Sequence, residues 1–309
     1  REALKTNTSG ANNTALGRDT LQANVSGSNN VAVGMDTLTA STTGASNTGV
    51  GFKALFTNTV ADGCVAVGFR ALETHNVGSS ALTYSTAVGY DAGRLITTGV
   101  NNTFVGGLAG DACTAGGSNT TLGYNSGGVL TTGSGNLFLG KDAGITGSPG
   151  GAHTTQSERI VLGDDTIVTA NIQVDWTIAS DARDKTDFTA LDIGLDFVKA
   201  LEPVTYKWDK RSKYGDKSAE DYDLNAQTPD GTHKEDWLDI GFKAQEVEAL
   251  EIAAGYTKEN KTNLVSSHSG DGKQMCLQYS KFVPILVKAI QDQQAIIDSL
   301  TARIEALES

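Results

Sequence analysis

A serine and a lysine five residues apart are the side chains of this sequence whose types could carry out a reaction together. They are Ser180 and Lys185, and the residues between them include Asp181, Arg183 and Asp184. A serine hydroxyl is a poor nucleophile at neutral pH and needs an adjacent base. A lysine is a base only when its amine is neutral, which burial or a nearby positive charge favours. Taken alone, this spacing favours an ordinary charged surface turn. The alternative is a nucleophile with its base, and the rest of the sequence must decide between them.

The neighbouring charges and the local conformation decide whether such a pair can work. Arg183 could supply the positive charge that lowers the pKa of the lysine, whereas Asp181 and Asp184 would act in the opposite direction. On an extended strand, residues five apart point to opposite faces. A turn must therefore bring Ser180 and Lys185 together.

The composition changes near residue 170, next to this pair. Residues 1–170 hold 29 of the 36 glycines and 19 charged residues, whereas residues 171–309 hold seven glycines and 41 charged residues. A change of this size predicts at least two folding units. Hydrophobic residues are 39% of the chain and aromatic residues only 6%, so small side chains must fill much of the core.

Charge and residue usage argue against several classes of protein. The net charge of −12 disfavours unaided binding to a nucleic-acid backbone. Cys64, Cys113 and Cys276 form neither a metal-ligand spacing nor an even-numbered disulfide framework, and the four histidines are scattered. Apolar runs stay well below the roughly 18 residues of a membrane span. We therefore expect no cofactor, metal, nucleic acid or membrane span.

The first half of the sequence consists of eight copies of a short repeat. Each copy has a short hydrophobic run that ends at a glycine, and the interval between successive glycines is 17 residues except from Gly68 to Gly89. A unit of this size cannot bury its own apolar face, so the copies must stack into a solenoid. Each glycine indicates a corner with positive φ or a tight backbone approach. These corner glycines are Gly17, Gly34, Gly51, Gly68, Gly89, Gly106, Gly123 and Gly140.

Residues 1–157 are therefore predicted to form a β-solenoid shaft with a strand of three to five residues in each coil. A disordered low-complexity linker is the alternative, but disorder does not require a constant register. The pattern resembles the β-roll head repeats of trimeric autotransporter adhesins and related β-helix repeats of phage tail fibres, which implies three chains side by side. The period differs from the shorter one usual in adhesin heads, so the resemblance is to the type of repeat.

The second half has a different, aperiodic order of elements. Residues 158–179 look like a β connector with strands over 159–163 and 172–178. Residues 180–309 then show an apolar helix pattern before Pro203, a β-rich run after it, a block over 240–250, and a C-terminal block that leads into a long helix. In this order these blocks resemble the C-terminal intramolecular chaperone domain of endosialidases, which also occurs on phage tail fibres. The resemblance covers about residues 175–309.

This resemblance implies an α+β domain that trimerises the fibre during folding and then cuts itself off. In that family a Ser–Lys dyad makes the cut, and Ser180 and Lys185 match its two positions. We expect the Ser180 hydroxyl to attack the preceding carbonyl, that of Ala179, and to give an ester that water or a rearrangement resolves. Cleavage before Asp181 is the alternative. Such a serine autoprotease acts once per chain and not in trans, with Asp181 and Arg183 as supporting residues.

A heptad pattern over residues 280–308 predicts a coiled-coil helix. Position d contains the single polar entry, Gln293. Ile at a with Leu at d favours two strands, but the resemblance implies three, so we expect a homotrimer. A single amphipathic helix packed on its own domain is the alternative. The a positions are Val283, Ile290, Ile297 and Ile304, and the d positions are Leu286, Gln293, Leu300 and Leu307.

These observations together predict a phage tail fibre or spike with a removable folding domain. Such a protein would be located in the virion, extracellular once assembled, and would take part in host attachment through a glycan or protein receptor that contacts the shaft or upstream domains. The alternative is a trimeric surface adhesin or structural fibre whose trimerisation domain is permanent and does not cleave.

Overall fold

The computed structural model describes residues 2–79, 82–173, 175–217, 219 and 221–308. It divides the chain into two units, of which the first comprises Arg1–Ile167 and Ser212–Gln227. The second comprises Val168–Arg211 and Thr228–Ser309. Val174, within the run expected as a strand over 172–178, lies outside the described residues.

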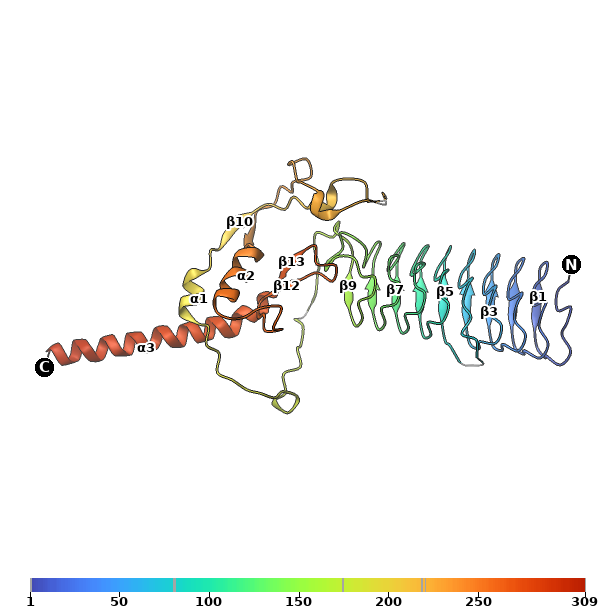
Figure 1. Cartoon of the computed structure of the whole chain (residues 1–309), viewed down its shortest axis with the longest axis horizontal. Helices are drawn as coiled ribbons and strands as arrows, with labels where there is room; N and C mark the ends of the chain where they lie inside the picture. Colours follow the sequence, from blue (N-terminus) through green and yellow to red (C-terminus); the bar gives the residue numbers. More distant parts are fainter. Residues whose placement is uncertain (1, 80–81, 174, 218, 220, 309) are drawn as a thin grey trace. The chain divides into compact units, whose positions relative to one another are not determined.

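The first unit is a β-solenoid with one three-residue strand in each coil, as the repeat predicts (Figure 1). Neighbouring strands are parallel and in register, so that Ala15 faces Ala32 and Phe104 faces Thr121. The strands are β1 (Thr14–Leu16), β2 (Val31–Val33), β3 (Thr48–Val50), β4 (Val65–Val67), β5 (Thr86–Val88), β6 (Thr103–Val105), β7 (Thr120–Leu122), β8 (Leu137–Leu139) and β9 (Ile160–Leu162).

The ninth strand and the segment after it differ from the expected β connector over 158–179. The β9 strand continues the solenoid, since Ile160 pairs with Leu137. The coil between Leu137 and Ile160 is longer than 17 residues, so this copy does not follow the regular period of the repeat. The second expected strand, over 172–178, does not occur among the described residues, and both Trp176 and Ile178 are exposed there. A strand needs a partner for its backbone groups, and the described residues offer none to this segment.

The corner glycines have the conformation that the repeat indicates. Their φ angles run from 108° at Gly140 to 145° at Gly17. At Gly106, a Cβ atom would lie 2.3 Å from the carbonyl oxygen of Gly123 in the next coil. No side chain fits in that gap, so the corner requires glycine for both conformation and space.

The large side chain that fills the core of the solenoid changes from leucine in the first coils to phenylalanine in the later ones. The first four coils bury a leucine completely, at the fourth position after the corner glycine. In later coils this position is glycine, and Phe104 and Phe138 fill the volume from the strand instead. A Cβ at Gly93 or Gly110 would lie 2.5 or 2.6 Å from the Phe104 ring. The buried leucines are Leu21, Leu38, Leu55 and Leu72.

A column of buried asparagines links the coils inside the solenoid. The Oδ1 atom of Asn30 accepts a hydrogen bond from the backbone N–H of Asn47 at 2.9 Å. The Asn47 side chain in turn accepts one from the backbone N–H of Cys64 at 2.9 Å. Cys64 thus occupies an asparagine position of the column, and burial raises the pKa of its thiol. Burial also raises the pKa of Cys113 to about 11, so both thiols have a structural place in the core.

The second unit is the α+β region that the sequence predicts, and it ends in a long helix (Figure 1). The strands form two antiparallel pairs, β10 with β11 and β12 with β13. A small apolar core joins Phe197, Val247, Val265 and Ile285. Its elements are α1 (Leu195–Ala200), β10 (Val204–Tyr206), β11 (Asp239–Gly241), α2 (Ala244–Ala253), β12 (Ser266–His268), β13 (Met275–Leu277) and α3 (Phe282–Glu308).

Helix α3 buries only its beginning in this core. Its buried residues are Phe282, Ile285 and Ala289. The heptad positions farther along are open, with Ile290 and Ile304 more than half exposed. None of the helices in the described part of the chain combines the length and apolarity needed to cross a lipid bilayer.

Candidate functional site

A short turn occupies the segment between the serine and the lysine. Residues Ala182–Asp184 form a single turn of 3-10 helix. The Asp181 carboxylate accepts a hydrogen bond from the backbone N–H of Arg183 at 2.9 Å and so caps the start of this turn. The backbone N–H of Lys185 donates to the Ala182 carbonyl at 3.2 Å. This is the turn that the spacing of the two residues requires.

The turn places the side chains of Ser180 and Lys185 against each other. The Lys185 Nζ atom lies 2.6 Å from the Ser180 Oγ atom and 3.2 Å from the Ser180 carbonyl oxygen. Both residues are exposed in the single chain. The amine donates the hydrogen bond in this arrangement, and the same contact could carry the hydroxyl proton to a neutral amine. The geometry therefore suits a nucleophile and its base.

Arg183 contacts Asp181 rather than the lysine. Its guanidinium makes a bidentate contact with Asp181, with Nη2 2.6 Å from Oδ2 and Nε 3.1 Å from Oδ1. These hydrogen bonds, together with the one from the Arg183 backbone, hold the pKa of Asp181 below its usual value. The two supporting residues named from the sequence thus stabilise the turn. An aspartate just before a three-residue turn is an N-cap signal that would have assigned this role.

The peptide bonds on both sides of the serine lie in an open segment. Ala179, Ser180 and Asp181 are all exposed. Neither bond is enclosed by a cleft of the single chain, and the described residues contain no group of His, Cys, Asp or Glu arranged to hold a metal ion. The arrangement has the components for one intramolecular attack.

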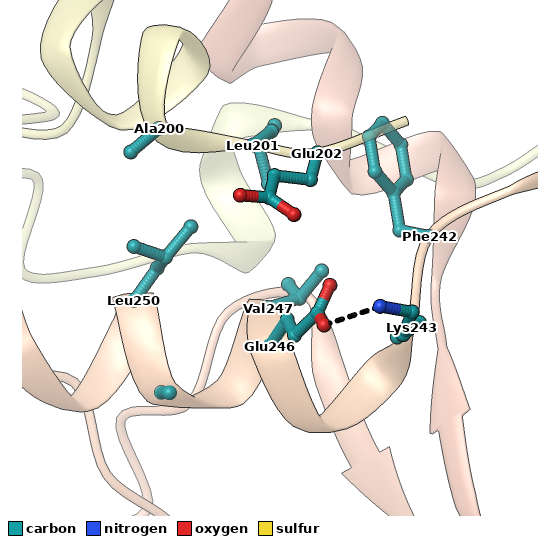
Figure 2. Close-up of a pocket in the computed structure, with 9 residues that line it drawn as sticks. Ala200, Leu201, Glu202, Phe242, Lys243, Glu246, Val247 and Leu250 are labelled. Atoms are coloured by element: carbon teal, nitrogen blue, oxygen red, sulfur yellow. Dashed lines mark hydrogen bonds and ion pairs between the residues drawn. The ribbon is translucent and has the colours of Figure 1, made fainter. Parts of the chain in front are cut away.

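The second unit also has a hollow of about 270 Å³, away from this pair (Figure 2). Phe242, Val247 and Leu250 form its apolar wall. On its rim, the Lys243 Nζ atom lies 2.6 Å from Oε1 of Glu246, and this hydrogen bond raises the pKa of the lysine. Neither Ser180 nor Lys185 lines the hollow, so it does not enclose the candidate nucleophile.

Comparison with protein families tests the resemblance independently. Residues 180–256 match the family described as chaperone of endosialidase. The match begins at Ser180 and includes Lys185, the capped turn between them, and helix α2. Comparisons with curated proteins and with solved structures give no significant match.

The chaperone-of-endosialidase region gives the pair a chemical context. The matched family is one of autoproteolytic chaperone domains, so residues 180–256 are consistent with a serine autoprotease, and that family implies a trimeric assembly. An intramolecular chaperone domain that follows a β-solenoid fits a protein of the phage tail-fibre type.

Proposed function

We propose that this chain is part of a phage tail fibre or spike whose C-terminal region assembles three copies, folds the shaft, and then cuts between Ala179 and Ser180. The observation that supports this most directly is the 2.6 Å contact between Lys185 Nζ and Ser180 Oγ at the start of the family match. The product would be a virion shaft, extracellular once assembled, that presents a surface to a host receptor such as a glycan or a protein.

Elementary ring chemistry favours the bond before the serine. The Ser180 Oγ atom reaches the Ala179 carbonyl carbon through a five-membered ring, whereas its own carbonyl would need a strained four-membered ring. The new bond joins Oγ to the Ala179 carbon, the bond from that carbon to the Ser180 nitrogen breaks, and the hydroxyl proton passes through Lys185 to the leaving amine. Water then hydrolyses the ester and leaves residues 1–179 and 180–309.

Assembly is the step that makes the lysine an effective base. A lysine amine is neutral at physiological pH only where burial or a neighbouring cation disfavours its charge. In the single chain, Ser180 and Lys185 are exposed and Arg183 is paired with Asp181. We propose that neighbouring copies cover this turn in the trimer. The cut would then follow assembly and would not precede it.

Two surfaces of the chain are suited to contact other copies. One is the open heptad face of α3. The other is the outward face of the solenoid sheet, formed by the first and third residues of each strand, whose middle residue is buried from β2 to β9. Every one of these outward residues is Thr, Val, Leu or Ile. Because the face repeats with each coil, a second copy of this chain matches its pitch along its whole length.

Denaturing intact-mass analysis of freshly purified protein tests the cut. We expect fragments 1–179 and 180–309 from the parent and a single uncut species from Ser180→Ala and Lys185→Gln. Lys207→Gln, which changes another exposed lysine of the same region, serves as the control and should be cut like the parent. An intact parent under all conditions would overturn the proposal and favour a permanent trimerisation domain.

A further inference from the structure

One segment of the C-terminal half of the sequence folds as part of the solenoid unit. Residues 212–227 lie within the chaperone-of-endosialidase match, yet they group with Arg1–Ile167 and not with the rest of the C-terminal region. Leu224 is completely buried, and Ser212 is almost so. We call the described residues of this segment, 212–217, 219 and 221–227, the clip.

Two lysines of the clip contact a buried carboxylate just after the last strand of the solenoid. The side chain of Asp165, three residues after β9, is only 4% exposed. The Lys217 Nζ atom lies 2.8 Å from its Oδ2 atom, and the Lys213 Nζ atom lies 3.9 Å from its Oδ1 atom. A buried carboxylate is costly unless cations or hydrogen-bond donors pair with it. The clip supplies two such cations.

A glycine in the coil before β9 leaves room for this contact. A Cβ atom at Gly147 would lie 3.1 Å from each of three atoms: Asp165 Oδ2, Lys217 Nζ and Ser212 Cβ. The φ angle of Gly147 is 95°, in the region that favours glycine. The solenoid thus has a carboxylate, Asp165, beside the space left by Gly147. Lys217 of the clip pairs with the carboxylate, and Ser212 and Lys217 fill the space.

We propose that the clip keeps the C-terminal region bound to the shaft after the peptide bond is cut, and that the Asp165 ion pairs make its release dependent on ionic strength. The proposal rests on the proposed function, because a cut between Ala179 and Ser180 puts Asp165 on the shaft fragment. Lys213 and Lys217 would then be on the other fragment. Both lysine side chains are partly open to solvent, so added salt reaches and screens them. Cutting and release thereby become two separate events.

The test separates retention from self-cleavage. A recognition sequence for a specific protease is inserted in the exposed stretch between Ala170 and Asn171, in a Ser180→Ala chain, and the added protease makes the cut. Size-exclusion chromatography then follows the two fragments from about 0.1 M to about 1 M NaCl, over which the Debye length falls from roughly 10 Å to roughly 3 Å. We expect co-elution at low salt and separation at high salt. Separation at every salt concentration would overturn the proposal, whether or not the natural chain cuts itself.

Matched variants assign the retention to the ion pairs. Asp165→Asn should raise the fraction of separated fragments at low salt by roughly ten-fold or more, because it leaves the clip lysines unpaired. Asp142→Asn is the control, since Asp142 pairs with Lys141 at the same end of the solenoid and not with the clip. The charge exchange Asp165→Lys with Lys217→Asp should restore part of the retention and guards against simple misfolding. Equal retention in Asp165→Asn and Asp142→Asn would contradict the proposal.

Discussion

The solenoid and the C-terminal region are stabilised in opposite ways. Each coil of the solenoid receives its backbone hydrogen bonds, its asparagine contacts and its apolar neighbours from the next coil, so the structure continues once it has begun. The C-terminal region has a small core of its own and leaves most of α3 uncovered. The first region propagates from neighbour to neighbour, whereas the second leaves an apolar helix face that the proposed assembly would cover.

This difference explains why one chain contains both regions. Every coil of the solenoid offers nearly the same strand to its neighbour, so three such chains could align one coil out of register at little cost. The C-terminal region outside the heptads of α3 does not repeat, so in the proposed trimer it would allow only one alignment of the copies. We therefore interpret it as the part that sets the register and the solenoid as the part that extends it. Loss of the register-setting part after assembly would leave the shaft kinetically trapped.

The largest expected effect comes from breaking propagation at one corner. Gly106→Ala places a Cβ atom 2.3 Å from the Gly123 carbonyl oxygen at a φ of 136°, so we expect a loss of about 3 kcal/mol or more, or failure to fold. Gly107→Ala is the control next to it, because the nearest atom to its Cβ would be 3.7 Å away. Thermal unfolding followed by circular dichroism measures both. Equal transitions in the two variants would show that the corners do not limit the solenoid.

A double-mutant cycle can test whether the buried Phe104 ring requires the glycine at position 110. Phe104→Ala should cost about 3–5 kcal/mol through the cavity that it leaves. Gly110→Ala should also destabilise, since its Cβ would lie 2.6 Å from the Phe104 ring. The double variant should lose less than the sum by about 1 kcal/mol or more, because the shorter side chain removes the clash. Chemical denaturation of the parent, the two single variants and the double variant measures the coupling. Strictly additive losses would show that the Phe104 ring does not depend on glycine at position 110.

Assembly should be lost when the open face of α3 is charged. Ile297→Asp changes a position that is about half exposed in the single chain, so we expect the free energy of unfolding of the single chain to change by only about 0.5 kcal/mol. The trimer, in contrast, should dissociate. Gln291→Asp, on another face of the same helix, should leave the trimer intact. Analytical ultracentrifugation distinguishes the two variants, and a trimeric Ile297→Asp chain would assign assembly to another surface.

The smallest expected effect is a pH dependence within the C-terminal region. Asp292 accepts hydrogen bonds from Lys288 and, at 3.2 Å, from the backbone N–H of Leu195, and these hold its pKa below the usual value of 3.8. A carboxylate with a lowered pKa stabilises the fold above pH 3.8, and this contribution disappears as the pH falls through the folded-state value. Asp292→Asn should therefore lower the thermal midpoint slightly at pH 7, and the difference should shrink as the pH falls below 3.8. A difference that persists in acid would show that the effect comes from something other than the charge.

The periodic part of the fold could be predicted from the sequence because each requirement recurs in every coil. A corner that admits only glycine, repeated at one interval, defines both the strand positions and their parallel register. The strand over 159–163 was predicted, but its place in the solenoid was missed because the longer coil before Ile160 breaks that interval. The expected strand over 172–178 was wrong for the described residues, since its pattern gave the strand type but could not supply a partner strand.

The two residues of the candidate site could be predicted from the sequence, but the arrangement of the charged side chains around them could be predicted only in part. The spacing of Ser180 and Lys185 required a turn, and the cap that forms it is local, from Asp181 to Arg183. The N-cap position of Asp181 could have been read from the sequence, but the orientation of the Arg183 side chain could not, because Asp181 and Lys185 are each only two residues away from it. The contact of Lys217 with Asp165 joins residues that are far apart in a stretch without a repeat, so no sequence pattern predicts it.

In the proposed function, Ser180 and Lys185 act only after the C-terminal region has assembled. Denaturing intact-mass analysis of Ile297→Asp beside the parent, with the association states measured on the same samples, tests this order of events. We predict a trimeric, cut parent and a monomeric variant that remains uncut although its Ser180 and Lys185 are unchanged. A monomeric variant that is cut as fast as the parent would show that the cut does not require assembly.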